Sequence, residues 1–175
     1  AQQNLEGLIA TAKQAPFSIQ ALSDTFVKFK AGGLDPTNGS MQALLDAVAA
    51  FGGSDELLKR AAIAIQQMGG KGVISMEELR QQLGEAVPTA INLMAKGVGK
   101  TYEQLVKEIS LGKVRAAPAL KAMFEQFQIA FGGKSAAMMD TFNGRIAQLK
   151  TSLVELALAF TGMDTAGNVA DGSLY

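Results

Sequence analysis

Three neighbouring residues, Gly99, Lys100 and Thr101, have the types that end a nucleotide-binding P-loop. Such a loop needs another glycine five positions before Gly99, because backbone amides wrap the β-phosphate while the lysine reaches the γ-phosphate. That position is Met94, and the stretch INLMAKG before Gly99 has helical rather than strand character. The sequence therefore favours Thr101 as the N-cap of a helix, with Gln104 as its capping-box partner.

A second glycine-rich stretch, GGKG at 69–72, also lacks the features of a phosphate cradle. It has neither the Gly-x-Gly-x-x-Gly spacing nor a strand before it. We interpret Gly69, Gly70 and Gly72 as the end of one helix, since glycine adopts the left-handed conformation without a Cβ penalty. Ser75 is then the predicted N-cap of the next helix, with Glu78 as its capping-box partner.

The residue types needed for most catalysis are missing. The chain has no cysteine and no histidine, which excludes disulfides, Ser-His-Asp and Cys-His catalysis, and almost all zinc sites. Glu77 and Glu78 are adjacent, so on a helix they point about 100° apart and do not converge on a substrate. We expect no catalytic, cofactor-binding or metal-binding residues and no enzyme activity. A small helical enzyme that uses carboxylates stays open as an interpretation, ranked third after the two that the last paragraphs of this subsection give.

The charges are balanced, with 16 Lys+Arg against 16 Asp+Glu. Such a balance gives no general attraction to nucleic acid or to an anionic membrane. A local basic excess lies between Met94 and Lys121, but its charges are spread over several elements and no aromatic residues are interleaved to stack bases. We interpret it as a solvated face and expect neither nucleic acid nor a small-molecule substrate as a partner.

Glycine pairs organise the chain into short helices, because each of four pairs follows an apolar segment with helical spacing. No convincing alternating strand is present. The sequence therefore predicts an all-α fold, a compact bundle of short helices joined by Gly-rich turns and followed by one long C-terminal helix. The predicted helices cover residues 3–14, 19–31, 41–51, 55–68, 76–83, 89–96, 102–110, 116–131 and 136–161.

The last helix has a heptad seam, with apolar residues at alternating spacings of three and four. The seam consists of Met139, Phe142, Ile146, Leu149, Leu153, Leu156 and Phe160. Two interpretations stay open: a helix-helix interface through which the chain self-associates as a coiled coil, or a core helix of this same domain. We predict a compact multi-helix domain at 1–132, a long amphipathic helix at 133–161, and a flexible tail or fragment end at 162–175.

The run IQQMGGKGVISMEELRQQL, from Ile65 to Leu83, resembles the tape measure domain of the tail length tape measure proteins of long-tailed bacteriophages and prophages. That domain shows an apolar helix ending in Gln/Met, a Lys-Gly turn, and then Ser/Thr-x-Glu-Glu-Leu-Arg-Gln. The stretches LGEAVPTAINLMAKGVGKTYEQLVKEISLGKV and FEQFQIAFGGKSAAMMDTFNGRIAQLKTSL resemble the segments that follow. The resemblance covers most of residues 16–155.

The resemblance implies a structural virion protein of the tail. In this family the tape measure occupies the lumen of the growing tube, its length sets tail length, and it is in the host cytoplasm during assembly. The implied partners are the tail tube protein, the tail assembly chaperone and the tail tip or baseplate hub. The chain lacks an initiator Met, which leads us to expect a processed product or, preferably, a piece excised from a longer protein.

The predicted helices argue against this piece being the ruler itself. A continuous helix of 175 residues would be about 260 Å long, whereas this chain is interrupted by helix stops and folds back. We therefore expect an anchoring or recruitment domain. The alternative is a stand-alone helical adaptor that binds a partner helix through the seam at 139–160.

Overall fold

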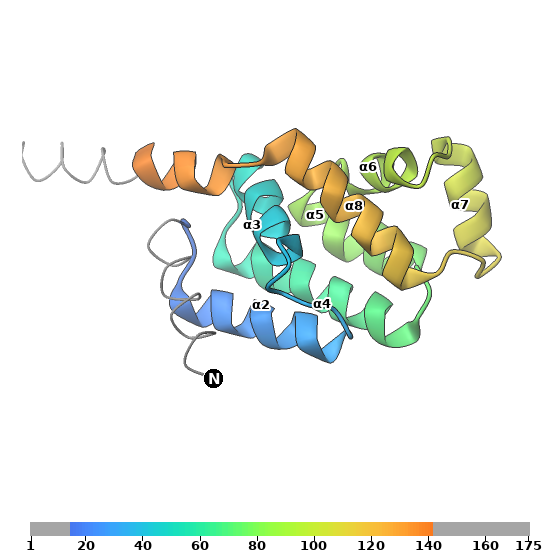
Figure 1. Ribbon diagram of the computed structural model, residues 1–175, viewed down its shortest axis with the longest axis horizontal. Helices are drawn as coiled ribbons and strands as arrows, with labels where there is room; N and C mark the ends of the chain where they lie inside the picture. The colour runs from blue at the N-terminus through green and yellow to red at the C-terminus, as the bar shows by residue number, and fades with distance from the viewer. Residues whose placement is uncertain (1–14, 142–175) are drawn as a thin grey trace, which may run out of the picture. The chain divides into compact units, whose positions relative to one another are not determined.

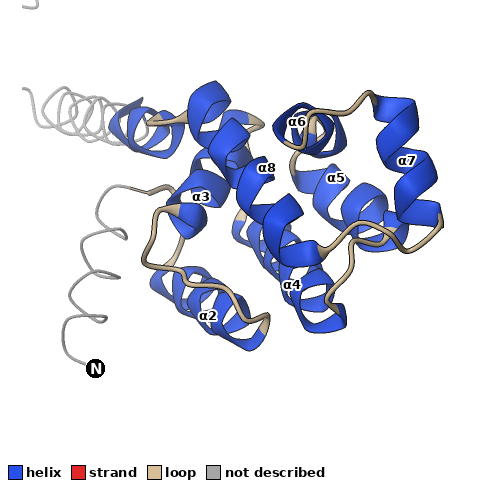
Figure 2. Ribbon diagram, turned by 45° about the vertical axis from the view of Figure 1, so that its right-hand side comes forward, coloured by secondary structure: helices blue, strands red, loops and turns tan. Residues whose placement is uncertain are grey.

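A computed structural model describes residues 15–141, whose regular secondary structure is entirely helical (Figures 1 and 2). The helices are α2 (Ile19–Ala31), α3 (Ser40–Ala50), α4 (Asp55–Lys71), the π-helix η1 (Glu77–Leu83), α5 (Gly84–Ala86), α6 (Ala90–Gly97), α7 (Tyr102–Ser110) and α8 (Ala116–Phe131). Residues 134–141 are also helical. The predicted all-α class is confirmed for the described part of the chain.

The chain divides into two units, Ala1–Met139 and Asp140–Tyr175. The predicted helix at 3–14 and the seam residues after Met139 lie outside the described residues. The long C-terminal helix and the predicted border between residues 132 and 133 therefore stay predictions.

Several helices begin where their local sequence predicts. The Ser18 and Ser54 hydroxyls accept hydrogen bonds from the backbone N–H groups of Ala21 and Leu57 and cap α2 and α4. Thr101 forms the predicted capping box, since its hydroxyl accepts from the Gln104 N–H at 3.2 Å and the Gln104 side chain accepts from the Thr101 N–H at 3.0 Å. Thr101 therefore starts α7.

Within residues 15–141, four packed pairs of helices enclose the core. Helix α2 packs against α4, α4 also packs against η1, and α8 packs against both α3 and α6. Helix α3 is the most enclosed of these elements, because every residue from Ala43 to Ala49 is buried. Helix α7 lies at the edge of the unit in both views (Figures 1 and 2).

The predicted end of the fourth helix is wrong. Helix α4 continues through Gly69 and Gly70 to Lys71, and only Gly72 takes the left-handed conformation, with φ of 74°. The reason is tertiary packing: a Cβ on Gly69 would lie 2.2 Å from the carbonyl oxygen of Gly32 at the end of α2. Gly69 is thus a site of close helix approach and Gly72 is the helix stop.

The capping box predicted for Ser75 and Glu78 is not formed. The helix after Ser75 is a π-helix over Glu77–Leu83, with no side-chain cap at its N-terminus. The Glu78 side chain is only 4% exposed, and its Oε1 accepts a hydrogen bond from Lys71 Nζ at 2.5 Å. Its Oε2 is buried without a partner among the described residues. Glu78 therefore pairs with Lys71 at the end of α4 and does not cap the helix that follows Ser75.

Candidate functional site: the joint after helix α8

The chain makes a sharp break after α8, and we call residues 132–135 the joint. Helix α8 ends at Phe131, Gly132 has an extended conformation with ψ of 129°, and Gly133 has φ of 80°. Only glycine adopts such a positive φ without strain. Helical structure resumes at residue 134. The joint thus separates α8 from the helix that begins at residue 134, and it lies within the first unit.

A carboxylate from the centre of the fold holds the joint. Asp46, on α3, accepts a hydrogen bond from the Gly133 N–H at 3.1 Å through Oδ2. Its Oδ1 accepts from the Ser135 N–H at 2.9 Å and from the Ser135 hydroxyl at 2.5 Å. Gln42, one turn earlier on α3, donates to Asp46 Oδ1 at 3.3 Å and to Ser135 Oγ at 3.0 Å.

Asp46 is buried, so its carboxylate needs hydrogen-bond donors close by to offset the loss of water. Asp46 is 4% exposed and Ser135 is 1% exposed. No salt bridge neutralises Asp46 within residues 15–141, and a buried charge is costly unless it is fully hydrogen-bonded. The positive end of the helix that begins at residue 134, together with the donors at Gly133 and Ser135, supplies the compensation. Asp46 therefore acts as a helix cap supplied from a distant helix.

Sequence reasoning did not identify Asp46. Ser135 lies within the first turn of the helix that begins at residue 134, and its hydroxyl donates to Asp46. A signal was present, because Asp46 is the only charged residue in the apolar run MQALLDAVAAF. Its partners are separated from it by 87 and 89 residues, so no local rule connects them.

A row of phenylalanine rings leads along α8 to the joint. Ring centroids are 5.6 Å apart for Phe29 and Phe124, 6.2 Å for Phe124 and Phe127, and 6.1 Å for Phe127 and Phe131. Phe51, just after α3, meets Phe131 edge-on at 5.5 Å. Such pairs add about 0.5–1.5 kcal/mol each beyond the burial of their area. The row packs the last turn of α8 against Phe51, the residue that directly follows α3.

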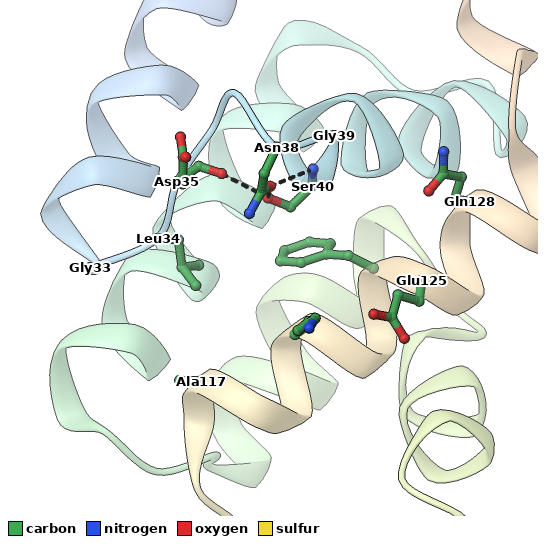
Figure 3. A pocket seen from close by; sticks show the side chains of 11 residues that line it. Gly33, Leu34, Asp35, Asn38, Gly39, Ser40, Ala117, Glu125 and Gln128 are labelled. Carbon is green, nitrogen blue, oxygen red and sulfur yellow. Dashed lines mark hydrogen bonds between the residues drawn. The ribbon is translucent and has the colours of Figure 1, made fainter.

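A cleft of about 310 Å³ lies between α8 and the loop that connects α2 to α3 (Figure 3). The loop holds its own shape: Asp35 Oδ1 accepts from the N–H and hydroxyl of Thr37, and the Ser40 hydroxyl donates to Asp35 O. The bonds from Thr37 lower the pKa of the Asp35 carboxyl below its usual 3.8. Lys121 and Glu125 of α8 line the opposite wall.

The residues considered for phosphate binding have structural partners. Gly99 has φ of 70° and ends the turn after α6, while Lys100 pairs with Glu108 of α7. Within residues 15–141 no three His, Cys, Asp or Glu side chains are grouped as metal ligands. None of the helices in that part of the chain has the length and apolar character needed to cross a membrane.

Comparison with known proteins identifies the family. The family model for "Tape measure protein" matches residues 1–161. The "Probable tape measure protein" of Salmonella phage Felix O1 (isolate Felix O1-VT1) is 37% identical over 115 residues, which are 61% of this chain and 16% of the relative. The "Mu-like prophage FluMu protein gp42" of Haemophilus influenzae (strain ATCC 51907 / DSM 11121 / KW20 / Rd) is 29% identical over 154 residues, 85% of this chain and 24% of the relative.

No solved structure matches the chain. The chain spans at most 24% of the length of these two relatives. Because the family model covers nearly all of its residues, the chain belongs to the tape measure protein family of phages and prophages, whose members are structural components of the tail.

Proposed function

We propose that this chain is an anchoring or recruitment domain of a tape measure protein rather than the ruler itself. The observation that carries the proposal is the compact fold of the first unit. Between Ile19 and Phe131 its helices are 3 to 17 residues long and are packed on one core. The ruler function requires length, and a folded unit supplies little of it.

A comparison of lengths supports this assignment. Residues 15–141 would extend about 190 Å as one continuous helix, at about 1.5 Å per residue. A compact domain of that many residues has a radius of gyration of only about 14 Å. Since the two relatives are at least four times longer than the parts they share with this chain, they have ample further sequence for a ruler.

In this proposal the domain helps set tail length indirectly, by fixing the start of the tape and organising tube assembly around it. Its site of action is the lumen of the tail tube, after assembly in the host cytoplasm. The partners that the family resemblance implies are the tail tube protein, the tail assembly chaperone and the tail tip or baseplate hub. Self-association through the seam at 139–160 is part of the same proposal.

The alternative, a stand-alone adaptor that binds a partner helix through the seam, has no structural observation in its favour. Met139 is the one seam residue within residues 15–141, and it is half-buried. The family match favours a tail protein instead.

A deletion in the full-length tape measure protein of a phage tests the proposal. Removing residues 40–131 takes about 140 Å from a ruler at about 1.5 Å per residue. An anchoring domain predicts that this deletion abolishes tail assembly, while deletion of an equal length from the later part of the protein gives complete but shorter tails. Assembled tails that are about 140 Å shorter after the first deletion would show that this segment is part of the ruler.

A further inference from the structure

The contacts at the joint tie the start of the next helix to the centre of the fold. Asp46 and Gln42 lie on α3, the most enclosed helix, and both bind Ser135. Met138, one turn later, packs against the core. We call Asp46, Gln42, Gly133 and Ser135 the hook. Without the hook, the helix that begins at residue 134 would be joined to the fold only through the backbone of Gly132 and Gly133 at the end of α8.

The position of the hook determines how force enters the domain. Tension applied to the chain after residue 141 reaches Ser135 before it reaches α8. With the hook closed, that tension passes through Asp46 to α3, whose surroundings must open before it can move. With the hook open, tension acts on the C-terminal turn of α8, and the helix can be peeled from the core one turn at a time.

The chemistry of Asp46 suits such a role better than it suits simple packing. An apolar residue of the same size at this position would avoid the cost of burying a carboxylate. The carboxylate instead accepts hydrogen bonds from two backbone N–H groups, a hydroxyl and a side-chain amide, which belong to separate segments. Hydrogen bonds to an ionised acceptor are roughly twice as strong as neutral ones.

We propose that the hook is a mechanical latch that transfers tension from the following chain to α3 and so keeps α8 from being peeled away. This proposal rests on the proposed function in one respect, namely that a longer tape follows the anchoring domain and pulls on it. The physical behaviour of the latch itself is a property of this chain and is measured on it directly.

Force spectroscopy provides the first test. The chain has no cysteine, so cysteines at the exposed position Gln67 on α4 and at Thr141 after the joint attach two handles uniquely. In the parent, the joint and α8 should come away together in one event. In Asp46→Asn, a separate event at lower force should precede it and lengthen the chain by roughly 20 Å. Residues 133–141 extend to about 30 Å at about 3.5 Å each, and the helix from residue 134 already spans about 12 Å of that.

A matched control separates the latch from a general loss of stability. Ile109→Val removes one methylene from the buried face of α7, away from the joint, and should lower stability without creating the early event. The latch is refuted if Asp46→Asn unfolds in the same single event at the parent's force. It is also refuted if Ile109→Val produces the same early event as Asp46→Asn.

Amide hydrogen exchange gives a second measurement that needs no handles. Asp46→Asn should speed exchange of the Gly133 and Ser135 amides by about tenfold or more, since their acceptor loses its charge. The Gln104 amide, which is held by the Thr101 capping box, should keep the parent's rate. Equal rates at Ser135 in parent and variant would overturn the proposal. Failure here would leave the anchoring function standing, because the deletion experiment tests that function independently.

Discussion

Gly69 and Gly70 are adjacent in α4, yet alanine at these two positions should have opposite effects on stability. A Cβ on Gly70 would meet nothing within 4 Å, and its φ is in the ordinary range. Gly70→Ala should therefore stabilise the fold by about 0.5–1 kcal/mol, because alanine loses less backbone entropy in a helix than glycine does. The site lies in the last turn of α4, which favours the lower end of that range.

A Cβ on Gly69 would lie 2.2 Å from the Gly32 carbonyl oxygen and 2.9 Å from the Gly32 carbonyl carbon. Both atoms belong to the backbone, so relief requires the ends of α2 and α4 to move apart by about 1 Å. Overpacking of this kind typically costs about 1–3 kcal/mol, which exceeds the helix-propensity gain. Gly69→Ala should therefore destabilise the fold. Because both variants share the gain in helix propensity, they should differ by the overpacking cost of about 1–3 kcal/mol.

The assay is urea unfolding followed by circular dichroism at helical wavelengths, with thermal unfolding as a second measurement. At roughly 2–4 °C per kcal/mol for a protein of this size, the two variants should differ in Tm by about 2–12 °C. An unchanged slope m in urea would assign the difference to stability rather than to the compactness of either state. A Gly69→Ala variant as stable as Gly70→Ala would refute the close approach of α2 and α4.

Three further predictions concern other parts of the chain. Gly97→Ala should destabilise by about 1–3 kcal/mol in urea unfolding, because its Cβ would lie 2.6 Å from the Ala122 oxygen at the contact of α6 and α8; an unchanged midpoint would contradict this. The hydrogen bond to Glu78 raises the pKa of Lys71 above its usual 10.5. The ion pair therefore stabilises the fold below pH 10.5, and this stabilisation is lost as the pH rises through the raised pKa. Lys71→Met, which has no amine to titrate, should lose less stability than the parent when the pH is raised through that range. The seam predicts that light scattering finds an oligomer for the parent and a folded monomer for the double variant Ile146→Asp, Leu153→Asp; a monomeric parent whose double variant unfolds would make the seam an internal core.

Local sequence rules predicted the helices well where local interactions decide them. The predicted ranges 19–31, 102–110 and 116–131 coincide with α2, α7 and α8. Helix α7 shows why: its start is fixed by the capping box of Thr101 and Gln104, which are only three residues apart. Its buried residues, Leu105 and Ile109, are four apart and give the helical period directly.

The same rules failed where contacts between distant segments decide the structure. Gly69 looked like a helix stop because glycine serves both as a left-handed cap and as a point of close approach, and the sequence does not distinguish these uses. The carboxylate of Glu78 pairs with Lys71 across a turn rather than with Ser75. Asp46 accepts hydrogen bonds from Gly133 and Ser135, which are more than 80 residues away in the sequence, so no local rule predicts this contact.

The glycines with positive φ also bear on whether this domain could ever serve as an extended ruler. A continuous α-helix needs φ near −63° at every residue, whereas Gly33, Gly52, Gly72, Gly112 and Gly133 all have φ between 65° and 80°. Straightening the chain would have to convert each of these turns to helix. It would also expose the side chains that α3, α4 and α8 now bury, at roughly 1.5–3 kcal/mol for each large apolar one.

The largest fully buried side chains include Phe29, Phe127, Leu44, Leu45 and Ile65, and they come from α2, α3, α4 and α8. Exposing this group alone would cost on the order of 10 kcal/mol, which is comparable to the entire stability of an ordinary domain. Helix formation in solvent returns little, since isolated helices are marginal in water. The folded unit is therefore the favoured form of this segment in water, which supports our proposal that it anchors a tape rather than measures length.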